Sequence, residues 1–182
     1  GKRRMKRLIL ICGANGIGKS TASKALLRVL PHSAYVESDS CRMTNPDDFR
    51  PALVQMQYRN LLALIGNALA CPEVSNVIFP YGFHGHRKAL FEKLWEEITR
   101  GFPDTRLIPL LLCCSPEENV RRAKADGRDP ERIERGMKNS RNAYEGMDWP
   151  CIDVTRLTPD ETAQEILRRL QLAETGISTG KV

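Results

Sequence analysis

Short, almost uninterrupted apolar segments alternate along the chain with longer segments whose apolar residues recur every three or four positions. The first pattern predicts buried strands and the second predicts amphipathic helices. The predicted strands cover residues 7–12, 33–38, 75–79, 105–114 and 151–154. The predicted helices cover residues 23–30, 47–70, 86–100, 115–125, a stretch from 130 to about 145, and 158–173. This alternation indicates an α/β fold with a parallel sheet that is covered on both faces.

Capping residues and prolines sharpen several of these boundaries. Ser115 and Pro116 suit the start of a helix, and a glutamate three residues after the serine completes a capping box. Thr158 and Glu161 repeat this spacing at the start of the last helix. Pro109 is unfavourable inside a central strand, which leaves open a start of the fourth strand after it.

The length and the charge of the chain suit one folded domain. Its 182 residues, 41% of them hydrophobic, contain no repeat, low-complexity tract or linker. The formal charge of +6 comes almost entirely from the opening GKRRMKR, so a nucleic-acid partner is not expected, although it is not excluded. We expect a single domain over residues 1–182, with a basic tail at 1–6 and a frayed tail at 175–182.

No segment has the length of a membrane span or a secretion signal. A span needs ~20 apolar residues and a signal peptide roughly 7 to 15, whereas Leu8 to Cys12 reaches a glycine after five. The six cysteines form no CxxC pair and no zinc-like cluster with histidine. Several lie in apolar runs, where free cysteine behaves as a small hydrophobe. These features predict a reduced, cytoplasmic protein without membrane contact.

The first predicted strand runs directly into GANGIGKST, which satisfies the pattern GxxxxGK[ST]. Its glycines allow successive N–H groups to point at phosphate oxygens, and the following helix presents its positive N-terminus to the same anion. In this pattern Lys19 reaches the β and γ phosphates, and the hydroxyl of Ser20 ligates Mg²⁺. The sequence therefore predicts binding of ATP and Mg²⁺ by Gly13, Ala14, Asn15, Gly16, Ile17, Gly18, Lys19, Ser20 and Thr21.

With this loop the chain resembles the small P-loop kinases, a group that includes gluconate kinase, shikimate kinase, chloramphenicol phosphotransferase and the kinase domain of polynucleotide kinases. The resemblance covers nearly the whole order of elements. It is carried by GANGIGKS, ESDSCR, the arginine-rich stretch 121–141 and the closing CIDVTRLTPDETAQEIL. It implies a three-layer P-loop NTPase fold with a five-stranded parallel sheet in the order 2-3-1-4-5, flanked by helices, and a small lid. The second and third strands would then lie beside the acceptor site.

Asp39 follows the second predicted strand, with Arg42 three residues later. A hydroxyl that accepts a phosphoryl group needs a carboxylate within hydrogen-bond reach to orient it and take its proton. The resemblance to polynucleotide kinases implies that Asp39 supplies this base and Arg42 contacts the acceptor or the transition state. Aspartate is also common at the start of an ordinary helix, and Glu37 is the alternative carboxylate.

The stretch 121–141 holds six arginines and is broken in its middle by Gly127 and Pro130. Two helical arms joined in this way suit a lid that closes over ATP and brings arginines to the transferring phosphate. The spacing of the family's lid favours Arg121 or Arg122, together with Arg128. The alternative is an exposed helix face with charge pairs along it.

The end of the third predicted strand departs from many relatives, which carry there an acid that helps to hold Mg²⁺. This chain reads FPYGFHGH instead, so the metal would depend on Ser20, phosphates, water and Asp39. The resemblance places Tyr81, His84 and Arg87 in the acceptor pocket. A metal site at His84 and His86 lacks a third ligand.

Together these features predict an ATP-dependent phosphotransferase that acts on a hydroxyl of a small-molecule acceptor, as a monomer or a homodimer. Two alternatives remain open at this stage. One is a nucleotide-binding ATPase or switch protein without an acceptor, and the other is a kinase of the 5′-hydroxyl of nucleic acid, which the nearly neutral folded part and the 6% of aromatic residues do not favour.

Overall fold

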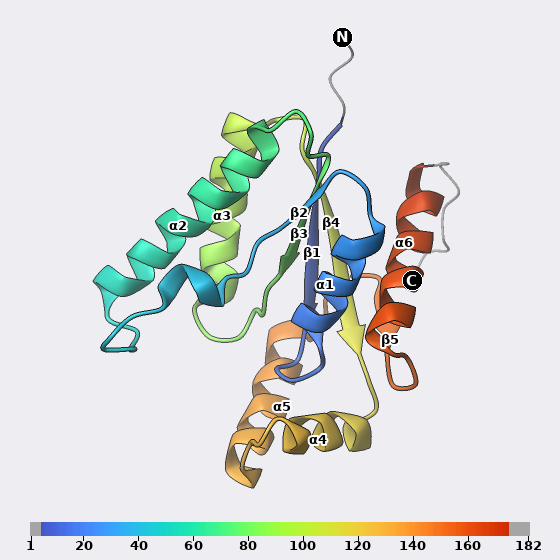
Figure 1. Ribbon diagram of the computed structural model, residues 1–182. Coiled ribbons are helices and arrows are strands. Elements are labelled where there is room, and N and C mark those ends of the chain that lie inside the picture. Colours follow the sequence, from blue (N-terminus) through green and yellow to red (C-terminus); the bar gives the residue numbers. More distant parts are fainter. Residues whose placement is uncertain (1–4, 175–182) are drawn as a thin grey trace.

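The computed structural model describes residues 5–174. The predicted basic tail lies outside this part except for Met5 and Lys6, and the predicted tail at 175–182 lies wholly outside it. The chain folds into a central sheet with helices on both faces and a pair of helices at one end of the sheet (Figure 1). The predicted α/β class is therefore confirmed.

The sheet has five parallel strands in the order β2-β3-β1-β4-β5. They are β1 (Arg7–Gly13), β2 (Ser33–Tyr35), β3 (Asn76–Pro80), β4 (Arg106–Cys113) and β5 (Cys151–Asp153). The central β1 is buried from its second residue to its end, as expected of a parallel strand with helices on both sides. The predicted strand order is confirmed. Because all five strands are parallel, their carboxyl ends lie at one edge of the sheet.

Pro109 lies inside β4, which begins at Arg106 rather than after the proline. The proline pairs in register with Leu10 of β1. On the other side, β5 pairs only with residues 111–113 of β4, so β4 is an edge strand at Pro109. Proline is tolerated at such a position because its missing N–H need not serve a strand on the open side.

Two helices cover each face of the sheet. In Figure 1, α1 (Lys19–Val29) and α6 (Pro159–Glu174) lie on one side, and α2 (Pro51–Ala70) and α3 (Arg87–Gly101) on the other. The remaining pair, α4 (Pro116–Ala125) and α5 (Pro130–Tyr144), lies below the carboxyl ends of the strands. No helix in residues 5–174 is long and apolar enough to cross a bilayer.

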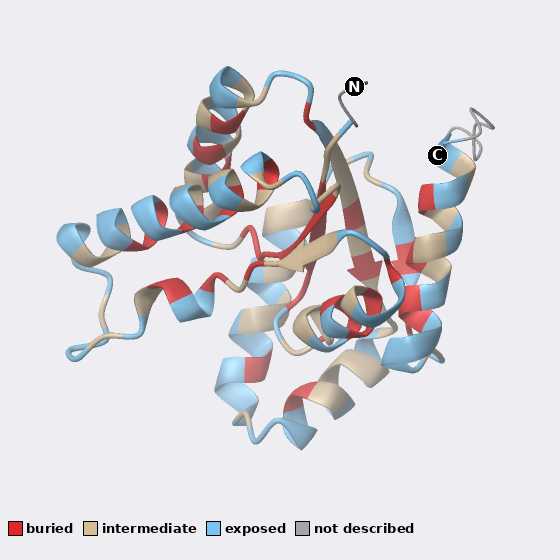
Figure 2. Cartoon of the chain, turned by 45° about the horizontal axis from the view of Figure 1, so that its top comes forward, coloured by how far each residue is buried: buried red, intermediate tan, exposed pale blue. Residues whose placement is uncertain are grey.

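Successive residues of β1 enter two separate apolar cores, because side chains alternate along a strand. Leu8 and Leu10 pack with the residues of α2 and α3, whereas Ile9 and Ile11 pack with those of α1 and α6. Figure 2 shows the buried residues along the sheet and on the inner sides of the helices, with exposed residues outside. This double core fixes β1 and therefore the loop that follows it.

The predicted capping box forms in full at α6, whereas at α4 only the bond to the Ser115 hydroxyl forms, because the N–H of Ser115 donates to Thr155 and the Glu118 carboxylate pairs with Arg121 and Arg122. The Ser115 hydroxyl accepts a hydrogen bond from the N–H of Glu118 at 3.2 Å. Thr158 and Glu161 bond each other reciprocally, at 3.0 Å and 3.1 Å. Capping therefore fixes the starts of α4 and α6 through residues close in sequence.

Two predicted helix starts were wrong. The first helix begins at Lys19 rather than at residue 23, because its first turn belongs to the glycine-rich loop and has no apolar periodicity. The second begins at Pro51 rather than at residue 47, since proline is favoured at the first helical position.

The prediction that all six cysteines are free was wrong for Cys113 and Cys151. These two form a disulfide between the neighbouring strands β4 and β5, with their Cα atoms 6.4 Å apart. The pairing depends on strand order, so their 38-residue separation in the sequence gave no sign of it. The free cysteines are Cys12, Cys41, Cys71 and Cys114, of which the first two are buried as expected.

Candidate active site

The loop between β1 and α1 turns sharply at three glycines. Gly13, Gly16 and Gly18 have φ angles of 151°, 81° and 101°, which side chains other than glycine rarely adopt. A Cβ atom on Gly13 would also lie 2.9 Å from the carbonyl oxygen of Leu112 in β4. The loop leads into the N-terminus of α1, whose first N–H groups have no partner within the helix. This arrangement suits an anion.

Lys19 is the first residue of α1, and its ammonium group lies within the loop. It donates hydrogen bonds to the carbonyl oxygens of Gly13 at 2.8 Å and Ala14 at 2.9 Å. Burial lowers the pKa of Lys19 to about 8, and the nearby guanidinium groups of Arg87 and Arg128 act in the same direction. An anion in the cavity would stabilise this charge, because an opposite charge nearby favours the ionised form.

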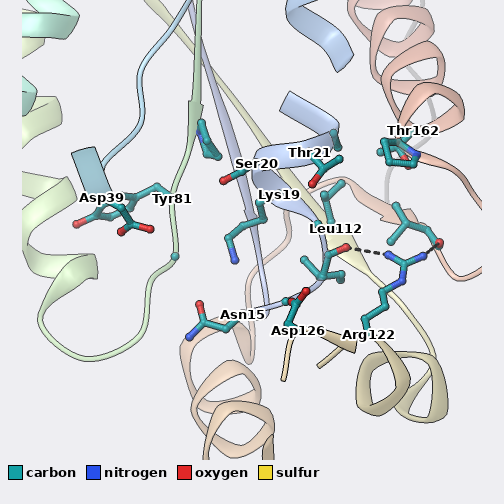
Figure 3. A pocket seen from close by; sticks show the side chains of 18 of the residues that line it. Asn15, Lys19, Ser20, Thr21, Asp39, Tyr81, Leu112, Arg122, Asp126 and Thr162 are labelled. Atoms are coloured by element: carbon teal, nitrogen blue, oxygen red, sulfur yellow. Dashed lines mark hydrogen bonds between the residues drawn. The ribbon is translucent and has the colours of Figure 1, made fainter. Parts of the chain in front are cut away.

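A cavity of about 570 Å³ lies over this loop (Figure 3). Figure 3 shows Lys19 and Ser20 at its centre, Asp39 and Tyr81 on one side, and Arg122 and Thr162 on the other. The predicted site residues that line it are Asn15, Gly16, Ile17, Gly18, Lys19, Ser20, Thr21, Glu37, Asp39, Tyr81, Arg87, Arg121, Arg122 and Arg128. Gly13 and Ala14 instead line another cavity behind the loop.

Asp39 begins the short 3₁₀ helix η1 (Asp39–Arg42), which follows β2. Its side chain is exposed and lines the cavity opposite Lys19 (Figure 3). It accepts no hydrogen bond from the described residues 5–174, so its carboxylate is available to a bound molecule. The charge of Asp39 also acts on Lys19 and His84.

Oxygen atoms that suit Mg²⁺ lie between this carboxylate and the loop. The hydroxyl of Tyr35, at the end of β2, donates a hydrogen bond to Glu37 and also interacts with the Ser20 side chain. Hydroxyl and carboxylate oxygens are the ligands that Mg²⁺ prefers. The part of the chain that the structure describes has no cluster of three or more histidine, cysteine or acidic residues that could hold a metal ion by itself. The donor set fits a metal shared with nucleotide phosphates and water.

Arg42 does not line the cavity over the loop. Its guanidinium donates hydrogen bonds to Asp47 at 2.9 Å and to the carbonyl oxygen of Asp48 at 2.7 Å, and it lies 4.7 Å from the centre of the Phe49 ring. Only 9% of its side chain is exposed. In this arrangement Arg42 supports the segment that follows η1.

The three lid arginines have different surroundings. Arg122 donates to the carbonyl oxygens of Ile17 and Val154, both at 2.8 Å, and so ties α4 to the phosphate loop and to the end of β5. Arg121 is mostly exposed and pairs with Glu118. Arg128 follows the turn at Gly127, and its Nη1 would lie 3.3 Å from a Cβ atom on Gly16. Of the three, Arg128 reaches over the outer side of the loop.

The loop after β3 brings Tyr81 and Arg87 to the lining of the cavity, where Tyr81 lies on the same side as Asp39 (Figure 3). The Tyr81 hydroxyl donates to the carbonyl oxygen of Arg87 at 3.1 Å, and the Arg87 guanidinium lies 6.0 Å from the Tyr81 ring. His84 does not line the cavity. Burial, together with the charges of Arg87 and Lys19, lowers the pKa of His84 to about 4, so this side chain is neutral at pH 7.

Tyr144 is a contact of this site that the sequence did not indicate. It ends α5, and its hydroxyl lies 3.3 Å from the N–H of Gly13 and 3.1 Å from the N–H of Phe83. Its ring stacks on the ring of Phe83. Tyr144 therefore connects α5 to both the glycine-rich loop after β1 and the loop after β3. No motif marks it, because its partners are distant in sequence.

The strand order and the glycine-rich loop between β1 and α1 define a P-loop fold. A second group of polar residues, which includes Asp39 and Tyr81, faces this loop across the cavity. No protein-family model matches the sequence, and a search of curated proteins finds no significant match. The structure nevertheless resembles many solved ones.

The tunicamycin resistance protein of Deinococcus radiodurans is 19% identical, with a TM-score of 0.67 over 95% of this chain and 97% of that one. A gluconokinase from Sinorhizobium meliloti is 18% identical, with a TM-score of 0.58 over 97% and 99%. A shikimate kinase from Aquifex aeolicus is 18% identical, with a TM-score of 0.59 over 93% and 99%. The chain thus has the fold of the small P-loop kinases, as the sequence predicted.

Proposed function

We propose that this chain is an ATP-dependent phosphotransferase that moves the γ-phosphoryl group to a hydroxyl of a small-molecule acceptor. The observation that carries this proposal is that Lys19 and the free carboxylate of Asp39 line the same cavity from opposite sides. Phosphoryl transfer depends mainly on positioning and charge neutralisation, and this cavity offers a place for each reactant. Similarity to solved gluconate and shikimate kinases supports the proposal.

The phosphate loop would bind the donor. Lys19 would exchange the carbonyl oxygens of Gly13 and Ala14 for phosphate oxygens, which are stronger partners because they are charged. The N–H groups of the loop and of the first turn of α1 would hold the same phosphates. Arg122 would keep the loop in place through its bond to Ile17.

Asp39 would act on the acceptor. Its carboxylate would accept a hydrogen bond from the attacking hydroxyl and take its proton as the new bond to phosphorus forms. Glu37 carries the second carboxylate of this wall, but it already accepts a hydrogen bond from Tyr35. This difference favours Asp39 as the base and leaves Glu37 beside Ser20.

Mg²⁺ would be held by Ser20 together with the nucleotide phosphates and water, with the carboxylates of Glu37 and Asp39 in its outer shell. When bound, the ion would neutralise phosphate charge. The proximity of Tyr35, Glu37 and Ser20 supports this arrangement, since an acid is missing after β3.

Arg128 would complete the site from the lid. Its position over Gly16 suits a contact with the transferring phosphate when α4 and α5 close over ATP. Arg121 pairs with Glu118 at the surface, where it could contact only the outer part of a nucleotide.

The test is an ATP-consumption screen with the purified chain and Mg²⁺ against sugars, nucleosides, antibiotics and oligonucleotides. Phosphorylation of a small alcohol that disappears in Asp39→Asn supports the proposal. ATP hydrolysis that no acceptor stimulates would favour the nucleotide switch, and transfer to oligonucleotides alone would favour a kinase of nucleic-acid ends.

A further inference from the structure

We call acceptor wall the side of the cavity that Glu37, Asp39, Tyr81 and Arg87 line, together with the adjoining segment up to Arg50. Two large apolar side chains stand out on the surface next to this wall. Met43 is 84% exposed and Phe49 is 64% exposed, the largest fractions among the large hydrophobic residues of positions 5–174. Both belong to the segment that joins η1 to α2, a few residues after Asp39. An isolated exposed apolar residue needs no explanation, but here the two most exposed ones share a single short segment.

Phe49 is held in a defined position rather than left without contacts. The Arg42 guanidinium lies 4.7 Å from the centre of its ring. On another side, the His86 ring meets it edge-on, with the ring centres 5.6 Å apart. Because His86 belongs to the loop after β3, Phe49 bridges the two segments that form the acceptor wall. An aromatic side chain fixed in this way presents a preorganised surface to a ligand.

This apolar segment is continuous with the candidate active site. Asp39 lines the cavity over the phosphate loop and also a second cavity of about 590 Å³. Arg42, Met43 and Gln57 are among the other residues of this second cavity. The polar residues Thr44, Asn45 and Asp47 also line it, whereas Phe49 lines neither cavity. An acceptor with its hydroxyl at Asp39 can therefore extend from the reaction centre to Met43, in the segment that also carries Phe49.

Most polar side chains of the acceptor wall already have partners within the protein. Gln57 donates to the carbonyl oxygen and hydroxyl of Ser38, at 3.1 Å and 3.2 Å. Thr44 donates to the carbonyl oxygen of Pro46 at 2.9 Å, and Arg42 is bonded to Asp47.

The other side chains of the wall are engaged in the same way. The hydroxyl of Tyr81 donates a hydrogen bond to the carbonyl oxygen of Arg87, and the hydroxyl of Tyr35 donates one to the carboxylate of Glu37. The carboxylate of Asp39 and the guanidinium of Arg87 make no hydrogen bond within residues 5–174, and the Nε of Arg42 is buried without a partner.

From these observations we infer that the acceptor is an alcohol with a neutral, apolar and preferably aromatic body, which packs on Phe49 and Met43 while its hydroxyl meets Asp39. The charges around this surface balance, because Arg42 pairs with Asp47 and Arg50 with Asp48. The surface therefore selects neither an anionic nor a cationic body. This inference rests on the proposed kinase activity and specifies its substrate class.

The experiment compares acceptors that differ only in an aromatic ring. Glycerol is paired with 3-phenoxy-1,2-propanediol, and methyl β-glucoside with phenyl β-glucoside, each assayed for ATP-dependent phosphorylation. We expect the aromatic member of at least one pair to have a kcat/KM at least about tenfold higher, because burying a ring against Phe49 is favourable. Transfer without any aromatic preference overturns the inference but leaves the kinase proposal standing. Transfer to none of these alcohols and to no acceptor of the wider screen, with ATP still bound, overturns the kinase proposal and the inference with it.

Variants then test whether Met43 and Phe49 cause the preference for aromatic acceptors. Phe49→Ser and Met43→Ser should remove most of the aromatic advantage by raising KM, whereas Phe49→Leu should keep part of it. The matched control is Leu64→Ser, which changes another exposed apolar residue, on α2. Calorimetry should give unchanged ATP affinity for all four variants. An aromatic preference that persists in the double variant Met43→Ser/Phe49→Ser overturns the inference.

Discussion

The two walls of the cavity are built in different ways. The phosphate wall is one continuous segment, residues 13–21, whose glycines, lysine and serine are fixed by β1 before it and α1 after it. The acceptor wall collects Glu37 and Asp39 after β2 and Tyr81 with Arg87 around the loop after β3. It also includes the adjoining segment up to Arg50, which reaches this cavity only through the second one that Asp39 lines as well. One wall is encoded locally, and the other is assembled from segments that only the fold brings together.

This difference in construction would assign nucleotide binding to one wall and acceptor specificity to the other. In the proposed function the phosphate wall would recognise a group that every nucleotide shares, so a short motif would be sufficient for it. The acceptor wall would have to fit one molecule, and its segments could change without disturbing the loop proposed to hold phosphate. Substitutions on the phosphate wall should therefore alter ATP affinity, whereas those on the acceptor wall should alter turnover or acceptor KM alone.

The largest effect is expected at the acceptor wall. Asp39→Asn keeps the shape of the side chain but removes the base, and it should lower turnover by about 10² to 10⁴. ATP affinity measured by calorimetry should change little, because Asp39 makes no bond to the phosphate loop.

The matched control for this variant is Asp160→Asn, which changes an exposed aspartate at the start of α6 that pairs with Arg28. It should leave turnover unchanged. If Asp39→Asn keeps the wild-type turnover, Glu37 becomes the candidate base. If Asp39→Asn loses ATP binding together with turnover, the two walls do not act separately in ATP binding and in turnover.

The second effect belongs to the phosphate wall. Lys19→Ala removes a cation that now bonds two loop carbonyls, and it should weaken ATP binding by about 10²-fold, since hydrogen bonds to charged groups are strong. Thermal unfolding should be nearly unchanged. Lys24→Ala, at an exposed position of the same helix, is the control. Equal ATP affinity in Lys19→Ala and the wild type would refute the assignment of the loop.

The same contrast explains what could be predicted from the sequence. The strand order, the loop and the caps of α4 and α6 depend on residues close together in the chain or on a fold with a local signature. Tyr144, the disulfide of Cys113 with Cys151, and the bond from Arg122 to Ile17 each join positions far apart. No pattern of hydrophobicity reports such pairs, because they follow from strand order and helix packing.

Arg42 illustrates what the spacing of residues in a sequence cannot reveal. Its spacing from Asp39 suggests a catalytic arginine, but spacing alone does not reveal that Asp47 and Phe49 fold back against its guanidinium. A catalytic role for Arg42 remains a prediction. The contacts that the structure gives it point to support of the acceptor segment.

A third, smaller effect tests the lid that connects the walls. Arg128→Ala should lower kcat by about tenfold or more while changing KM for ATP less, because a contact made on closure stabilises the transition state more than the ground state. Arg121→Ala, which removes a surface partner of Glu118, is the control.

Hydrogen exchange over residues 121–141 supplies a second measurement of the lid. Protection should rise in three steps, from the empty protein to a non-hydrolysable ATP analogue and then to analogue with acceptor. Equal protection in all three states would remove the lid from the mechanism. Protection that depends on the nucleotide alone would favour the switch protein.

The smallest effect concerns pH and isolates the charge of Lys19. Burial lowers its pKa to about 8 in the free protein, and only the protonated form attracts phosphate. ATP affinity should therefore be full below this pKa and fall as the pH rises through it, by about tenfold between pH 7 and pH 9, provided that bound phosphate raises the pKa above this range. Lys19→Arg, which stays charged, and Lys19→Ala, which has no charge, should both lack this decline, so comparison with them removes the titration of ATP itself. Calorimetry at pH 7, 8 and 9 measures the slopes. If ATP affinity depends on pH in the same way in the wild type and in Lys19→Arg, Lys19 stays protonated from pH 7 to pH 9. The burial of Lys19 in the phosphate wall would then have no effect on ATP binding.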